Sequence, residues 1–306
     1  MLRSLLIVLL ALAGPFGLAQ VVTPDAAAQP AQSQPFYARI PGMFPFDLPN
    51  IDPPGTVKLI VHPRFGDLLR RDYIRVDAGF RWAINNRFEF SPEARFYLTH
   101  GLGDTDDGYG VGEIRLGTKY VLPTWPSEAM ETALTLAAYV PIKDAPLDLT
   151  DGFNHLTPGF LIQRHLIRHP KWTVFSGAGL DLIDQSDVAG TPVRNQPLED
   201  SMNFTAGAIY DLGQIKWTLT TTYATTAWLG DETNHFLYVT PNVMWYVPKK
   251  WVFNSKTQWI LVLGARVSWG PDGTEISTSS RVRAEITFRQ VMSKFRLMSP
   301  TEPGTR

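Results

Sequence analysis

The chain has 306 residues, a formal net charge of −1 at pH 7 and no cysteine, and 44% of its residues are hydrophobic. The absence of cysteine excludes a disulfide scaffold, a cysteine nucleophile and any thiolate metal site. The near-neutral charge gives no electrostatic basis for a nucleic-acid partner, while 24 glycines and 24 prolines disfavour long helices and leave room for one large all-β domain.

The N-terminal segment "MLRSLLIVLLALAGPFGLAQ" has the composition of a secretory signal peptide. Arg3 supplies a short positive region, residues 5–13 form an apolar run too short to span a membrane, and residues 17–19 are a small-residue cleavage site. We predict a signal peptide over residues 1–19, with cleavage after Ala28 as the alternative. The sequence therefore predicts export in a Gram-negative-type bacterium.

Residues 20–55 are rich in proline, alanine and glutamine and show no periodicity. Such a composition favours an extended linker that cannot bury a core. We predict a periplasmic lead-in to the folded domain over this range.

From residue 56 onward, apolar and polar side chains alternate in segments that turn residues separate. The segment "QIKWTLTTTYATTAWLG" (214–230) is longer than an ordinary strand of about five or six residues, but it suits a tilted strand that crosses a bilayer in about 9 to 11 residues. A long strand of a soluble sandwich is the alternative for this segment alone. The whole pattern, which ends with "SRVRAEITFR" (280–289), predicts about twelve strands, and an even number is typical of outer-membrane barrels.

The connections between these segments fall into two length classes. Short links such as "NN" (85–86) and "LGQ" (212–214) alternate with long ones such as "THGLGDTDDGYG" (99–110) and "DQSDVAGTPVRNQPLED" (184–200). Outer-membrane barrels have short periplasmic turns and long extracellular loops. We therefore predict a transmembrane antiparallel up-and-down β-barrel over residues 56–289 and a periplasmic tail over residues 290–306.

Aromatic residues mark the ends of the predicted strands. A girdle at the lipid headgroups is expected on the short-turn side, formed by Trp82, Phe88, Tyr120, Trp172, Tyr210, Trp217 and Trp245. The opposite rim is predicted to hold Phe153, Trp228, Phe236 and Trp269. These features predict a monomer in the bacterial outer membrane, with membrane lipid and the barrel-assembly machinery as partners.

Charged residues gather on the predicted inner face of the first four and the last two strands, which closure makes neighbours. They are Arg75, Asp77, Arg81, Arg87, Glu89, Glu93, Arg95, Glu113, Arg115, Lys119, Arg266, Arg281, Arg283 and Glu285. A network of neutralising pairs that fills the interior is one interpretation. A lane that orients a polar or anionic solute is the other, because rings of charge set selectivity in pores, and both can hold together.

Three segments resemble an outer-membrane family often labelled phenol-degradation meta-pathway or transporter-like proteins. They are "FRWAINNRFEFSPEARFY" (80–97), "YGVGEIRLGTKYVLP" (109–123) and "ALTLAAYVPI" (133–142). The similarity covers residues 73–185, and Glu113 stands where the family often has aspartate. The resemblance implies a barrel that admits small, often hydrophobic or aromatic molecules.

The sequence contains partial motifs for calcium binding and for lipid hydrolysis. Asp104, Asp106 and Asp107 in "GDTDDG" have oxygen ligands for Ca²⁺ but lack the full calcium-loop pattern, so a solvated acidic loop is preferred and no metal or cofactor is predicted. Outer-membrane phospholipases need a His-x-Ser motif, whereas "HLTPG" (155–159) offers Thr157, and no Gly-x-Ser-x-Gly elbow occurs. We therefore do not expect an enzyme.

The sequence predicts a porin-like barrel for passive passage of a small solute, with hydrophobic and aromatic molecules among the candidates. Two alternatives stay open. One is a closed structural barrel that serves as a surface anchor or adhesin, since the loop over residues 184–200 can fold inward or outward. The other, less favoured, is a lipid-acting enzyme of the outer membrane.

Overall fold

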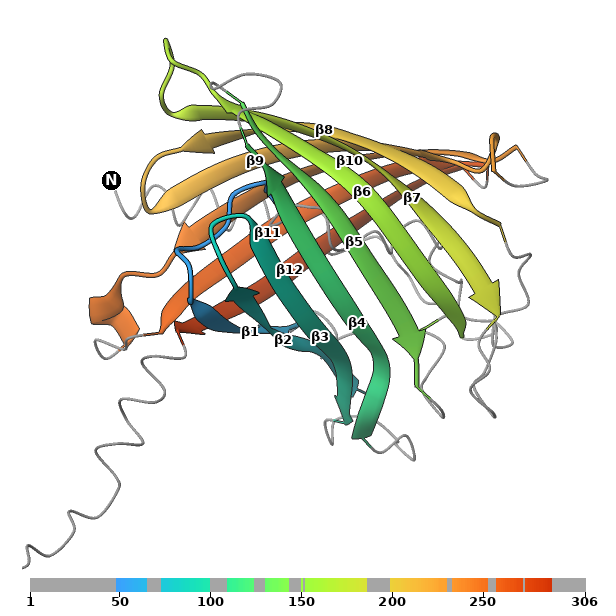
Figure 1. Ribbon diagram of the computed structural model, residues 1–306, viewed down its shortest axis with the longest axis horizontal. Coiled ribbons are helices and arrows are strands. Elements are labelled where there is room, and N and C mark those ends of the chain that lie inside the picture. The colour runs from blue at the N-terminus through green and yellow to red at the C-terminus, as the bar shows by residue number, and fades with distance from the viewer. Residues whose placement is uncertain are drawn as a thin grey trace, which may run out of the picture. The chain divides into compact units, whose positions relative to one another are not determined.

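The fold is a closed antiparallel barrel of twelve strands (Figure 1). The computed structural model describes residues 48–64, 73–99, 109–123, 130–142, 150, 152–185, 199–229, 233–252, 257–271 and 273–287. Each strand pairs with its neighbour in sequence, and β1 closes the ring on β12. The predicted up-and-down topology and strand number are therefore confirmed. Among the described residues, no helix is long and apolar enough to cross a membrane.

The strands are β1 (Val57–Pro63), β2 (Tyr73–Ala83), β3 (Phe88–Thr99), β4 (Tyr109–Leu122), β5 (Glu131–Pro141), β6 (Phe153–His165), β7 (Trp172–Gln185), β8 (Ser201–Asp211), β9 (Ile215–Thr225), β10 (His235–Tyr246), β11 (Gln258–Gly270) and β12 (Gly273–Thr287). One turn of 3₁₀ helix, η3 (Lys249–Val252), follows β10. Most strands have 11 to 15 residues, which suits tilted strands that cross a bilayer.

The two faces of each strand differ in chemistry, as β9 illustrates. Trp217 and Leu219 are each 52% exposed, whereas Thr218 and Thr220, on the other face, are 4% and 5% exposed. Alternation along a strand sends successive side chains to opposite faces. The apolar set therefore covers the outside of the barrel and the polar set lines the inside, as the alternation predicts.

Two strand boundaries differ from the predicted ones. β9 ends at Thr225, because a turn follows in which the Leu229 N–H donates to the Thr226 carbonyl (3.0 Å) and the Asn234 N–H donates to Thr226 Oγ1 (3.1 Å). β12 begins at Gly273, earlier than the alternation at residues 280–289 indicates. Its first residues, "GTEISTSS", are mostly small and polar, so their pattern does not distinguish a strand from a loop.

The aromatic girdle on the short-turn side is largely on the outer surface. Trp82, Trp172 and Trp217 are 41% to 52% exposed. Phe153 and Phe236 lie at the predicted end of their strands, but they are only 6% and 9% exposed and face the interior instead of the lipid. Phe153 precedes the inward His155 by two residues, so the period of two also turns it inward.

Candidate functional site

The inner face of β1–β4 carries a dense set of charged side chains, which we call the charged wall. Its members are Lys58, Arg64, Arg75, Asp77, Arg81, Glu89, Glu93, Arg95, Glu113, Arg115 and Lys119. Antiparallel register aligns residues of the same parity, so that Asp77 lies beside Arg95 and Arg95 beside Glu113. Strand pairing therefore converts charges that are 18 residues apart in sequence into direct contacts.

Nearest the long loops, Asp77 joins two arginines. Its carboxylate accepts hydrogen bonds from Arg64 Nη2 (3.0 Å) and Arg95 Nε (2.9 Å). Arg95 Nη1 also lies 3.4 Å from Glu113 Oε1. Hydrogen bonds between charged groups are stronger than those between neutral groups, so this chain of contacts fixes four side chains on four neighbouring segments.

Midway along the wall, Arg115 is the connecting residue. Arg115 Nη1 donates to Glu93 Oε1 (3.0 Å), and Arg115 Nε donates to the Tyr139 hydroxyl (3.2 Å) on β5. The guanidinium carbon also lies 5.8 Å from the centre of the Tyr139 ring. The charged wall therefore continues onto β5 through an aromatic side chain.

Nearest the short turns, Lys119 and Glu89 form a pair (Nζ to Oε1, 3.3 Å) in which each side chain is only 4% exposed. Lys119 Nζ also donates to the Asn50 carbonyl (3.4 Å), and Lys58 Nζ lies 2.6 Å from Asp52 Oδ1. The residues just before β1 therefore contact inward-facing lysines of the wall. The predicted boundary between lead-in and barrel falls within this short described segment.

The remaining predicted residues have different placements. Arg266 lies on β11 with its guanidinium carbon 5.5 Å from the Tyr238 ring centre, and Arg283 on β12 is 6% exposed. Arg87 does not join the wall, because it lies in the exposed β2–β3 turn, where its N–H donates to Asn85 Oδ1 (2.8 Å). The side chains of Arg281 and Glu285, and all of Asp104, Asp106 and Asp107, lie outside the described residues.

The wall opposite is uncharged over most of its length, and the ion pair of Lys216 with Asp211 (2.8 Å) lies at its short-turn end. In the ring order, β8 lies six positions from β2 and β9 six positions from β3, half of the twelve-strand circle. Its inward polar side chains, which we call the hydroxyl wall, are Ser201, Asn203, Thr205, Thr218, Thr220 and Thr222. The Thr205 and Thr222 hydroxyls contact each other at 3.0 Å. A solute in the lumen would therefore have cations and carboxylates on one side and neutral oxygens on the other.

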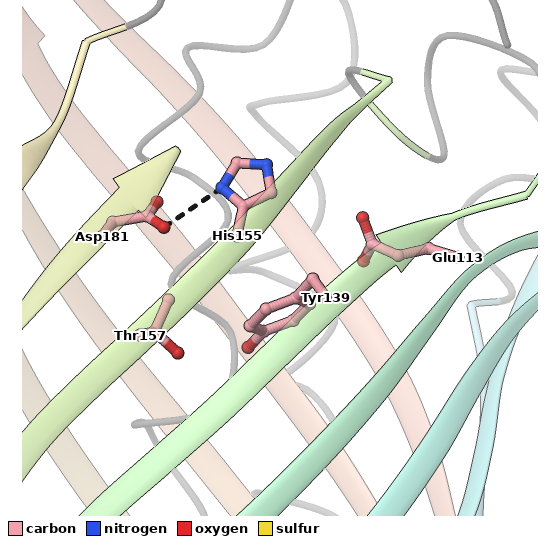
Figure 2. A pocket seen from close by; sticks show the side chains of 5 residues that line it. All are labelled: Glu113, Tyr139, His155, Thr157 and Asp181. Atoms are coloured by element: carbon pink, nitrogen blue, oxygen red, sulfur yellow. Dashed lines mark hydrogen bonds and ion pairs between the residues drawn. The ribbon is translucent and has the colours of Figure 1, made fainter. Parts of the chain in front are cut away.

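A small pocket lies between these walls, lined by Glu113, Tyr139, His155, Thr157 and Asp181 (Figure 2). His155 Nδ1 lies 3.1 Å from Asp181 Oδ1, with both side chains buried, and the Tyr139 ring meets the imidazole edge-on at 6.2 Å. The space is about 10 Å³, enough for about one water molecule. The pocket is too small for a substrate.

The His155–Asp181 pair has the orientation that a hydrolase uses, but Thr157, the hydroxyl residue that lines the same pocket, does not serve it as a nucleophile. Figure 2 shows the Thr157 hydroxyl directed away from the imidazole, and it donates to the Ala137 carbonyl (3.2 Å) instead. A serine-type triad requires the hydroxyl to contact the histidine. Sequence reasoning missed this pair because its members are 26 residues apart, although their inward parity on neighbouring strands was available as a signal.

Metal binding finds no support in the part of the chain that the structure describes. No cluster of three or more histidine, aspartate or glutamate side chains there is arranged to hold a metal ion.

Comparison with known proteins supports the fold. No protein-family model matches the sequence, and no curated protein matches it. The COG4313 outer membrane channel from Pseudomonas putida F1 is similar in structure, with a TM-score of 0.52 and 14% identity over 80% of this chain and 99% of that one. The KdgM porin (TM-score 0.42, 10% identity, 76% and 97% covered) and the NanC porin (0.46, 7%, 75% and 97%) are also similar.

The COG4313 protein is an outer membrane channel. At such low identity the likeness establishes the architecture, which is that of an outer-membrane β-barrel. The apolar exterior of this barrel fits the same environment, because a closed barrel leaves no unpaired backbone edge in lipid. The resemblance to the phenol-degradation family stays a prediction.

Proposed function

We propose that this protein is a passive outer-membrane channel for small, polar, negatively charged solutes. The observation that carries the proposal is the composition of the charged wall, in which cations outnumber carboxylates. The cations are Lys58, Arg64, Arg75, Arg81, Arg95, Arg115 and Lys119, and the carboxylates are Asp77, Glu89, Glu93 and Glu113, with Asp52 of the preceding segment beside Lys58. A surplus of positive charge along a lumen raises the local concentration of anions.

The ion pairs support this role as well as the interpretation of a structural network. Each carboxylate holds a neighbouring cation in place, as Asp77 does for Arg64 and Arg95. Cations whose positions are fixed in this way present a constant field to a passing solute. The pairing therefore both stiffens the wall and positions the positive charge that it carries in excess.

A second candidate solute class is apolar or aromatic, as the family resemblance implies. Met244, Ile260 and Val262 form an inward-facing cluster, each 3% exposed, with Tyr246 packed against them. An apolar patch of this kind on the inner face gives a contact for a hydrophobic molecule. It lies on β10 and β11, away from the hydroxyl wall's β8 and from most of the charged wall.

Single-channel recording in planar bilayers tests the proposal. Under a KCl gradient we expect discrete conductance steps and a reversal potential shifted toward the chloride equilibrium potential. A cation-selective current would overturn the anion preference. Absence of any conductance, with the long loops intact or deleted, would favour a closed anchor or adhesin barrel.

The permeation rates of two matched solutes distinguish between the anionic and the apolar solute class. Benzoate and its neutral analogue benzyl alcohol share an aromatic ring and differ in charge. If the charged wall selects, benzoate permeates faster; equal or faster passage of benzyl alcohol favours the apolar route. A phospholipase assay on the refolded protein addresses the enzymatic alternative, and activity that disappears in Thr157→Ala would reinstate it.

A further inference from the structure

The hydroxyl wall contains buried oxygen atoms that no protein group satisfies. Ser201 Oγ, Asn203 Oδ1, Thr218 Oγ1 and Thr220 Oγ1 are all buried and have no hydrogen-bond partner within the described part of the chain. Their side chains are 0%, 1%, 4% and 5% exposed, respectively. Buried polar atoms without a partner are rare in proteins and call for a water molecule, an ion or a ligand.

These four atoms lie along one line on the inner face of two paired strands. All four side chains have inward parity on the paired strands β8 and β9, where Gly207 pairs with Thr220 and Ile209 with Thr218. The distance along the strands from Asn203 to the level of Thr218 is about 20 Å, at about 3.4 Å per residue. A line of this length spans several contact points for one small molecule or successive positions for a moving one.

Local contacts hold the line in place. The Asn203 amide donates to the Gly179 carbonyl (3.0 Å), which leaves the amide oxygen Oδ1 as the open acceptor. Between the open positions, the Thr205 and Thr222 hydroxyls satisfy each other. The wall is therefore ordered even though four of its oxygens are left over.

The chemistry of these oxygens selects a class of ligand. A threonine or serine hydroxyl can both donate and accept a hydrogen bond, and it carries no charge. Hydroxyl groups on a solute are the matching partners, because they too donate and accept. A carboxylate alone would gain less here than at the charged wall, where arginines offer paired donors.

An aromatic ring stands beside the line. A Cβ at Gly207 would lie 2.4 Å from Phe175 Cζ and 2.9 Å from Phe175 Cε2, so the edge of the Phe175 ring lies against this glycine, whose cross-strand partner is Thr220. An apolar ring next to hydroxyls combines an apolar contact with polar ones. Molecules with C–H faces and hydroxyl edges, such as sugar rings, match both.

We propose that the hydroxyl wall is a binding track for the polyhydroxylated part of the solute, so that the transported class is hydroxylated carboxylic acids of the sugar-acid type. This inference rests on the proposed function. The carboxylate faces the cations of β2 and β3, and the solute hydroxyls contact the open oxygens of β8 and β9 across the lumen. The solute therefore satisfies both walls at once.

The test compares two carboxylates of similar ring size, D-glucuronate and cyclohexanecarboxylate, as blockers of the KCl current through single channels. We expect glucuronate to reach half-block at a concentration roughly tenfold lower, as about two extra hydrogen bonds allow. Thr218→Val with Thr220→Val removes two open hydroxyls at constant shape and is expected to abolish the difference. Thr221→Val, on the lipid-facing side of the same strand, is the matched control and keeps it.

Block is measured relative to each variant's own KCl current, and binding of glucuronate is measured separately by calorimetry on the protein in detergent. Equal block by the two carboxylates, or a difference that survives in the double variant, overturns the track but leaves the channel. Absence of current overturns the channel, and calorimetry then decides the track alone. Glucuronate binding that Thr218→Val with Thr220→Val does not weaken overturns it.

Discussion

The two facing walls of the lumen differ in how their buried polar side chains are hydrogen-bonded. On the charged wall, side chains satisfy one another, as in the contacts of Asp77 with Arg64 and Arg95. On the hydroxyl wall, Thr218 and Thr220 are as buried as Glu89 and Lys119 but have oxygens with no partner among the described residues. The first wall pairs most of its charges internally, although Arg64 Nε has no partner among the described residues, whereas the second leaves several neutral oxygens open to another molecule.

The barrel can carry both walls because its stability does not depend on an apolar interior. The backbone ladder closes on itself through β1 and β12, and most of the large exposed apolar side chains face outward. In lipid, closure satisfies every backbone group of the strands. The inward positions are therefore available for function, and the contrast between the walls reflects what the lumen does.

The largest effect is expected from breaking the distinction between inside and outside. Thr221→Arg places a charge on the lipid face near the middle of β9, which costs about 2 to 4 kcal/mol in a transmembrane barrel. Thr222→Arg places the same charge on the inner face one residue away, at a half-buried position, and should cost less. Urea titration of folded protein in lipid vesicles measures both, and similar destabilisation of the two variants would contradict the assigned faces.

The next effect tests whether the charged wall depends on its pairs. Asp77→Asn leaves Arg64 and Arg95 without their shared carboxylate, and since Asp77 is 22% exposed we expect a loss of about 2 kcal/mol, below the value for a fully buried pair. Asp211→Asn is the control, because its pair with Lys216 is 40% and 29% exposed and is worth about 0 to 1 kcal/mol. Equal losses in vesicle unfolding would contradict a cooperative network.

A smaller effect tests the packing of the hydroxyl wall. Gly207→Ala puts a Cβ 2.4 Å from Phe175 Cζ and 2.5 Å from the Leu219 carbonyl oxygen, which is backbone and cannot move freely. Such overpacking costs about 1 to 3 kcal/mol. The control is Ala206→Ser, which lies on the lipid-facing parity of β8. Gly213→Ala is unsuitable as a control because the φ of +83° at Gly213 is strained for alanine. A neutral Gly207→Ala would show that Phe175 does not cover this site.

The sequence was sufficient for the architecture because one physical rule, alternation with a period of two, determines both the strands and their faces. That rule correctly turned Arg75, Asp77 and Glu113 inward, and it failed where the pattern fades, as at Arg87 in a turn and at the small polar residues that begin β12. Phe153 and Phe236 lie at the predicted strand ends but face inward, because parity and not aromatic character sets the face of a strand residue.

The side-chain contacts between strands could not be predicted from the sequence, for a different reason. Parity gives the face of a residue, but the pairing register decides which residues meet, and register depends on turn geometry and bulges. The shift between Arg95 and Phe96 is one such irregularity, because Arg95 pairs with Glu113 whereas Phe96 pairs with Val111. The open oxygens of the hydroxyl wall likewise required knowledge of their neighbours.

The smallest expected effect concerns the ion selectivity that the charged wall confers. Arg115→Gln removes one cation of the charged wall and leaves Glu93 without its guanidinium partner, so the chloride-to-potassium permeability ratio should fall, by about twofold for one charge in a multiply charged pore. Arg87→Gln removes the same charge from the exposed β2–β3 turn and should leave the ratio unchanged. Reversal potentials under a KCl gradient measure both. If Arg87→Gln shifted the ratio as much as Arg115→Gln, selectivity would arise at the channel mouth, and the charged wall would serve stability alone.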